Sequence, residues 1–164
     1  QSKSVLGDSS PAASVSTSSA SLPTLPDTCS FSIVVRISNM DVMPARSNLF
    51  IQLTDSIGRQ NDKIRLKCSV THRRKFQPGH SDLFVLVDQL LLEDLKSIEI
   101  WHQKREAGPP LPLHSITVIE HNSHTAYHFK CDGHKMGSAD PEDRTMTSAK
   151  FTVCDTARVF TKGN

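Results

Sequence analysis

The sequence predicts an all-β protein, an antiparallel β-sandwich. Apolar and polar residues alternate with a period of two along most of the chain from Cys29 onward, which is the pattern of strands with one buried face. Clusters of Gly, Pro, Asn and Asp separate seven or eight such runs, as in sandwiches built from short strands. The one helix-like stretch, Asp88–Leu95, is too short for more than a single turn.

The first three runs have clear inner faces. The apolar positions of "FSIVVRI" are Phe31, Ile33, Val35 and Ile37, and those of "LFIQL" are Leu49, Ile51 and Leu53. In "KIRLKCSV" the inner face is expected to hold Ile64, Leu66, Cys68 and Val70, and the outer face Lys63, Arg65 and Lys67. Further short runs follow at 82–87, 95–102, 113–120, 124–131 and 150–154. We expect a core residue at Cys131 as well.

Composition divides the chain into three parts. Residues 1–28 are mostly Ser, Ala, Thr and Pro and predict a disordered linker, because such a stretch has almost nothing to bury. Residues 29–134 hold the predicted sandwich. Residues 135–164 begin with a polar loop, and the spacing of Phe151 and Val153 indicates an extra strand or a C-terminal extension.

Bulk properties limit the class of function. The 164 residues, 37% of them hydrophobic, suit one domain, and a net charge of +2 is too small for a dedicated nucleic-acid domain. The cysteines are widely spaced, which favours a reduced intracellular protein, although their even number leaves two disulfides open. They are Cys29, Cys68, Cys131 and Cys154. No stretch approaches the roughly 20 apolar residues of a membrane span, and no secretory signal is visible. The expected location is cytoplasmic, at the membrane periphery.

The sequence lacks the common catalytic motifs. It contains no GxSxG, HExxH, P-loop or GxGxxG, and nothing in it places a nucleophile beside a base. We therefore expect a binding module and not an enzyme.

Two groups of residues suggest metal binding without forming a convincing site. The segment "EHNSHTAYHFKCDGH" holds His121, His124, His128, Cys131 and His134. On a strand, His124 and His128 face one side and Cys131 the other, which opposes a four-ligand zinc site. The aspartates at strand ends that are candidates for calcium are Asp41, Asp55, Asp62 and Asp82. They form no dense cluster, and Asp is common in turns, so no metal or cofactor is predicted and calcium is the only candidate left.

A basic stretch is the most informative feature. The candidate residues for lipid or partner binding are Lys63, Arg65, Lys67, Arg73, Arg74, Lys75 and Trp101, with Arg59 preceding them. Cations near an anionic membrane contribute about 1 kcal/mol each, whereas the patch lacks the interleaved aromatics of a nucleic-acid site. The alternatives are an ordinary solvated strand face and, for the single Trp, a packed indole in place of a partner contact.

Several motifs in order resemble the PLAT domain, also called LH2, of lipoxygenases, pancreatic-type lipases and polycystins. They are "FIQLTDSIGR", "FQPGHSDLF", and "LKSIEIWHQ" followed by "LPLHSITV", within about residues 30–134. The resemblance implies a sandwich of two four-stranded sheets and no catalysis by the domain itself. It also implies that Trp101 lies on a strand leading into an edge loop used for membrane or protein contact.

The departures from the family pattern indicate a divergent member. "MPARSN" replaces a Gly-rich loop, Gln103 replaces the Asp after "IWH", and Leu111 replaces a Trp. In the calcium-binding members of the family that loop and that Asp supply oxygens to calcium, so their absence here makes calcium binding less expected. Two functions follow: a module that targets a larger protein to anionic membrane lipid, or a protein–protein interaction module without direct lipid binding.

Overall fold

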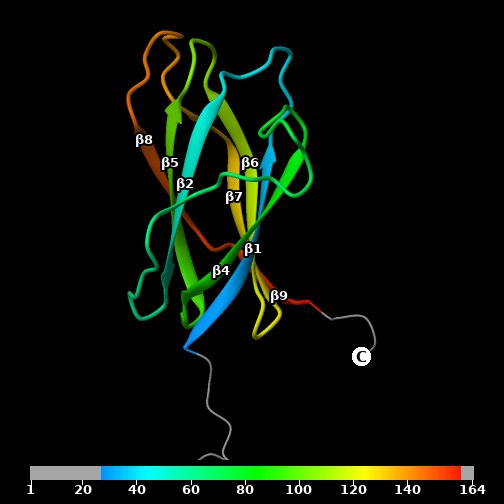
Figure 1. Cartoon of the computed structure of the whole chain (residues 1–164), viewed down its shortest axis with the longest axis vertical. Helices are drawn as coiled ribbons and strands as arrows, with labels where there is room; N and C mark the ends of the chain where they lie inside the picture. The colour runs from blue at the N-terminus through cyan, green and yellow to red at the C-terminus, as the bar shows by residue number, and fades with distance from the viewer. Residues whose placement is uncertain (1–26, 160–164) are drawn as a thin grey trace, which may run out of the picture.

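The computed structural model describes residues 27–159, which form nine strands and no helix. The strands are β1 (Thr28–Ile37), β2 (Ser47–Asp55), β3 (Ile64–Arg65), β4 (Ser81–Leu90), β5 (Leu95–Lys104), β6 (Leu111–Glu120), β7 (Thr125–Met136), β8 (Thr147–Thr152) and β9 (Asp155–Arg158). They make a five-stranded sheet in the order β4-β1-β6-β7-β9 and a four-stranded sheet in the order β3-β2-β5-β8. Figure 1 shows the two layers side by side.

The predicted fold class, an all-β antiparallel sandwich, is confirmed. The structure differs from the predicted two four-stranded sheets by one strand. β9 pairs with β7 at the edge of one sheet and makes that sheet five-stranded. All four residues of β9 are exposed, so it has no buried face for an alternating pattern to reveal. Of the predicted linker, residues 1–26 lie outside the described part of the chain.

The core lies between the two sheets and consists of the inner faces that the alternation predicted. Phe31, Ile33, Val35 and Ile37 of β1 are all fully buried, as are Leu49, Ile51 and Leu53 of β2. Outward positions on the same strands are half-buried or exposed. Burial of these side chains supplies the main driving force for the fold, about 1.5–3 kcal/mol for each large apolar side chain.

The interpretation of "KIRLKCSV" as one long strand is wrong. Only Ile64 and Arg65 pair with β2, opposite Ile51 and Phe50. The chain then crosses the open side of the sandwich from one sheet to the other. The Leu66 amide still donates to the Leu49 carbonyl of β2 (2.8 Å), whereas the Val70 amide donates to the Leu83 carbonyl of β4 (2.7 Å). Alternation orients side chains only while a strand is paired, so it ends here.

The cysteine predictions have mixed outcomes. Cys131 is buried, as expected, but Cys68 is exposed because it lies in the crossing segment and not in a paired strand. All four cysteines are unpaired. Within residues 27–159 there is no helix with the length and apolar character of a membrane span.

Candidate anion-binding site

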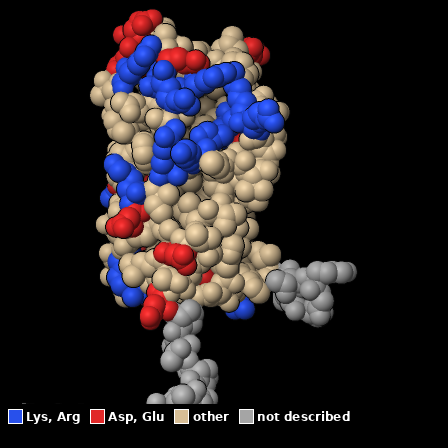
Figure 2. Space-filling view, viewed as in Figure 1, with Lys and Arg blue, Asp and Glu red and all other residues tan. Residues whose placement is uncertain are grey.

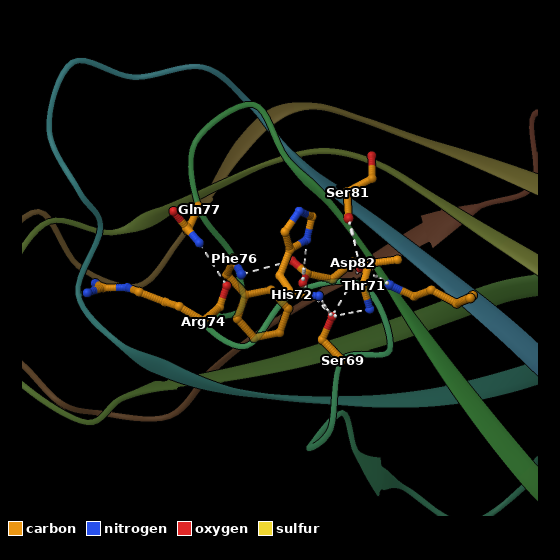
Figure 3. A network of polar contacts seen from close by, with 9 residues as sticks. Ser69, Thr71, His72, Arg74, Phe76, Gln77, Ser81 and Asp82 are labelled. Atoms are coloured by element: carbon orange, nitrogen blue, oxygen red, sulfur yellow. Dashed lines mark hydrogen bonds and ion pairs between the residues drawn. The ribbon is translucent and has the colours of Figure 1, made fainter.

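The segment between β3 and β4, residues 66–80, carries most of the predicted cations and is named here the basic loop. A buried carboxylate holds it in place. Asp82 has no exposed surface; its two oxygens accept hydrogen bonds from the Ser69 hydroxyl (2.6 Å) and the Phe76 amide (2.9 Å). The His72 Nδ1 atom lies 3.4 Å from the same carboxylate. Figure 3 shows Asp82 among these partners.

Two further contacts fix the middle of the basic loop. Phe76 adopts a left-handed backbone conformation (φ 62°), and its buried ring packs against Phe84 with 5.8 Å between ring centroids. The Lys75 ammonium donates to the carbonyls of Leu66 (3.2 Å) and Lys67 (2.7 Å). Partial burial, followed by the positive charges of Arg65 and Arg105, lowers the pKa of Lys75. The loop is therefore preorganised and lies among other cations.

Arg46 and Arg105 are brought together by the pairing of β2 with β5. The register places Ser47 opposite Lys104, and one residue further the Arg105 amide donates to the Arg46 carbonyl (2.7 Å). The Arg46 amide donates to a carboxylate oxygen of Glu106 (2.9 Å). Sequence reasoning missed these two arginines, because they lie far apart in the sequence and β2 and β5 are not consecutive strands.

The basic loop and this arginine pair enclose a pocket of about 340 Å³. Its lining is Pro44, Ala45, Arg46, Ser47, Arg73, Arg74, Lys75, Phe76 and Arg105. Five of these residues are cations, and no carboxylate of residues 27–159 lies within 4.0 Å of their charged nitrogens. Figure 2 shows Lys and Arg gathered on the upper part of this face, at the end where the loops preceding β2 and β4 lie in Figure 1. The pocket is thus a concentrated positive site at one end of the sandwich.

The predicted site residues lie at three places on the surface. Arg73, Arg74 and Lys75 line the pocket, whereas Arg65 and Lys67 line a smaller crevice of about 220 Å³ beside β4. Lys63 lies apart from both, over the outer face of the four-stranded sheet. Its ammonium is 4.6 Å from the centroid of the half-buried Trp101 ring.

Lys63→Met is expected to lower the free energy of unfolding by about 0.5–1 kcal/mol, because it removes the cation that lies over Trp101. Trp101 is the only Trp of the chain, so its fluorescence emission should change as well. Lys67→Met is the matched control. It should leave the emission unchanged, because the Lys67 ammonium lies over no aromatic ring of the described residues. An unchanged emission in Lys63→Met would contradict the contact.

The candidate calcium ligands do not converge. Asp82 is occupied by the basic loop. The buried Asp55 accepts hydrogen bonds from Ile57 and Arg59 in its own turn and from the Glu93 amide between β4 and β5. Burial acts to raise the pKa of Asp55, but the hydrogen bonds from Glu93, Arg59 and Ile57 outweigh it and lower the pKa. No three His, Cys, Asp or Glu side chains in the described part of the chain are grouped to hold a metal ion. The candidate aspartates therefore do not converge on one site among residues 27–159.

The histidine-rich segment is likewise dispersed. His128 contacts the Thr117 hydroxyl (3.0 Å) and His121 contacts Ser32 (2.7 Å), while Cys131 is buried on the opposite face of β7. His134 packs against Phe151 with 5.8 Å between ring centroids. His128 and Cys131 lie on opposite faces of β7, as the strand geometry predicted, whereas His124 lies in the turn before β7 and not on the strand.

The described sandwich has the fold of a part of lipoxygenase chains. A lipoxygenase variant in complex with arachidonate matches with a TM-score of 0.58 and 13% identity, over 77% of this chain and 17% of that chain. Coral 8R-lipoxygenase, whose structure is described with calcium activation via a C2-like domain, matches with a TM-score of 0.57 and 14% identity, over 76% and 17%. A calcium-dependent 11R-lipoxygenase matches with a TM-score of 0.52 and 13% identity, over 76% and 17%.

These similarities support the PLAT resemblance at the level of the fold. The chain spans only about 17% of the length of the lipoxygenases it matches, so the activity of those whole proteins does not transfer with the fold. No family model and no curated protein matches the sequence.

Proposed function

We propose that this chain is a non-catalytic module that attaches a larger protein to anionic membrane lipid through the basic loop and the arginine pair. The observation that carries the proposal is the gathering of five cations from three segments around one pocket, without a carboxylate partner within 4.0 Å in residues 27–159. Each cation near an anionic surface contributes about 1 kcal/mol. Because anionic lipid is concentrated in the cytoplasmic leaflet, the proposed location is the cytoplasmic face of a membrane.

The similar structures support a role within a larger protein. The coral enzyme is described as activated by calcium via a C2-like domain, whereas the aspartates here are dispersed or already hydrogen-bonded. In this chain the positive charge at the membrane would come from its own side chains. Binding should therefore be insensitive to a chelator and strongly weakened by salt.

A protein partner is the second candidate. β4 is an outer strand of the five-stranded sheet, and its outward side chains Val85 and Val87 are 45% and 60% exposed. The basic loop covers the edge of β4 at Ser81 and Leu83, and the edge beyond Leu83, with its apolar side chains, is a surface for strand pairing with another chain. Binding to a protein that does not respond to salt would favour this function over the first.

Sedimentation with vesicles tests the proposal. The chain should bind vesicles that contain phosphatidylserine, release them at high salt, and ignore neutral vesicles. Arg73→Gln with Arg74→Gln should weaken binding by about 30-fold, the equivalent of about 2 kcal/mol. Lys96→Gln with Lys130→Gln removes the same charge from exposed positions on β5 and β7 and should have a much smaller effect. Equal binding to neutral vesicles would contradict the proposal.

A further inference from the structure

We propose that the pocket between the basic loop, Arg46 and Arg105 binds a ligand that carries two or more phosphate groups close together, either free in solution or as a phosphorylated lipid headgroup. This inference rests on the proposed function and narrows it from anionic surfaces in general to one class of anion. It depends on three observations: the charge arrangement, the shape of the pocket and its rigidity.

The charge arrangement is unfavourable without a ligand. Arg46 and Arg105 are neighbours across adjacent backbone segments, joined by a hydrogen bond of 2.7 Å, and like charges at such positions repel. Arg73 and Arg74 reach the same pocket from the basic loop. The nearby carboxylate, Glu106, directs an oxygen to the Arg46 backbone amide and makes no ion pair within 4.0 Å in the described chain. A multiply charged anion would relieve this repulsion.

The shape of the pocket favours clustered phosphates over a flat charged surface. A volume of about 340 Å³ lies at the lower end of the range of small-molecule sites. Four of its five cations are arginines, whose planar guanidinium groups make paired hydrogen bonds to phosphate oxygens. Pro44, Ala45 and the Phe76 side of the basic loop supply apolar walls. A ring that bears several phosphates would place each of them near a different arginine.

The rigidity of the pocket separates contact residues from positioning residues. The Lys75 ammonium is committed to two backbone carbonyls, so Lys75 holds the loop and the four arginines make the ligand contacts. Asp82 fixes the backbone on either side of Arg73 and Arg74 through Ser69 and Phe76. A site that is ordered before binding loses less entropy when the ligand arrives.

Calorimetric titration tests the inference with inositol trisphosphate and inorganic phosphate as probes at the same salt concentration. Inositol trisphosphate should bind at least about tenfold tighter than inorganic phosphate, because it engages one or more additional charged hydrogen bonds. Arg46→Gln with Arg105→Gln should weaken its binding by roughly 10- to 100-fold. Lys63→Gln with Lys150→Gln, an equal charge change on the outer face of the four-stranded sheet, should change it by less than about threefold.

Vesicles of matched surface charge identify the source of the phosphates. Tighter binding to vesicles with phosphatidylinositol bisphosphate than to those with phosphatidylserine would support a headgroup ligand. Binding of the soluble probe without binding to any vesicle would support the inference and overturn the proposed function. Equal affinity for both soluble probes, or an unchanged affinity in the arginine variant, would overturn the inference, while binding to phosphatidylserine vesicles would leave the proposed function intact.

Discussion

Asp82→Ala is expected to lower the free energy of unfolding by about 3–4 kcal/mol. The substitution removes the acceptor of the Phe76 amide and the Ser69 hydroxyl. A buried donor left without a partner costs about 1–3 kcal/mol, which applies to the Phe76 amide. The half-buried Ser69 hydroxyl loses the same acceptor at a smaller cost. The left-handed conformation of Phe76 (φ 62°) adds strain that the hydrogen bond to Asp82 now offsets.

Urea denaturation of the purified chain measures this loss. Asp62→Ala, an exposed aspartate in the loop before β3, is the matched control and should stay within about 0.5 kcal/mol of the wild type. Trypsin should also cut the Asp82 variant faster at Arg73, Arg74 and Lys75, because the basic loop loses its attachment. A loss below 1 kcal/mol with unchanged cleavage would mean that Asp82 does not hold the loop.

The sandwich could be predicted because its strands have one buried and one solvent face. Alternation in β1 and β2 identified inner faces that the structure buries. The same rule failed after Arg65, where the chain crosses between sheets and side-chain direction no longer follows a ladder. The alternation of apolar and polar residues shows which face of a paired strand is buried. It does not show at which residue the pairing with the neighbouring strand stops.

The site could be predicted only where its residues are neighbours in sequence. Arg73, Arg74 and Lys75 were found because they are adjacent, whereas Arg46 and Arg105 meet only through the pairing of β2 with β5. Asp82 was interpreted as a loop carboxylate, and its role as a buried acceptor depends on the path of the basic loop. The pocket is therefore a product of topology, since three separate segments form it.

His102 is a buried polar residue that the sequence could have revealed. It continues the inner face of Ile98 and Ile100 on β5 and is fully buried. The Ser47 hydroxyl donates to the Ala45 carbonyl (2.9 Å), so the Nε2–H of His102 donates to the Ser47 oxygen (2.8 Å). The Nδ1 atom then carries the lone pair and has no hydrogen-bond partner. Ser47 also lines the pocket, so this hydrogen bond joins the core to the site.

The unpartnered Nδ1 atom makes the stability of the chain sensitive to acid. Burial, followed by the positive charge of Lys104, lowers the pKa of His102 from 6.5 to about 4. Between these two values the unfolded chain binds a proton that the folded chain does not, so stability is full above pH 6.5 and falls as the pH drops toward 4. The expected loss is about 1.4 kcal/mol per pH unit and about 3 kcal/mol in total.

Unfolding free energies of the wild type and of His102→Gln, measured in urea at several pH values between 7 and 4.5, isolate this contribution. The glutamine variant keeps a donor for Ser47 but has no titrating group, so its own stability should depend much less on pH in this window. The other titrating side chains are the same in both proteins, and their effects cancel in the difference between the two curves. Parallel curves would show that His102 binds its proton equally well in the folded and in the unfolded chain, and would contradict the lowered pKa. Converging curves would show that the core at this end of the sandwich excludes the proton.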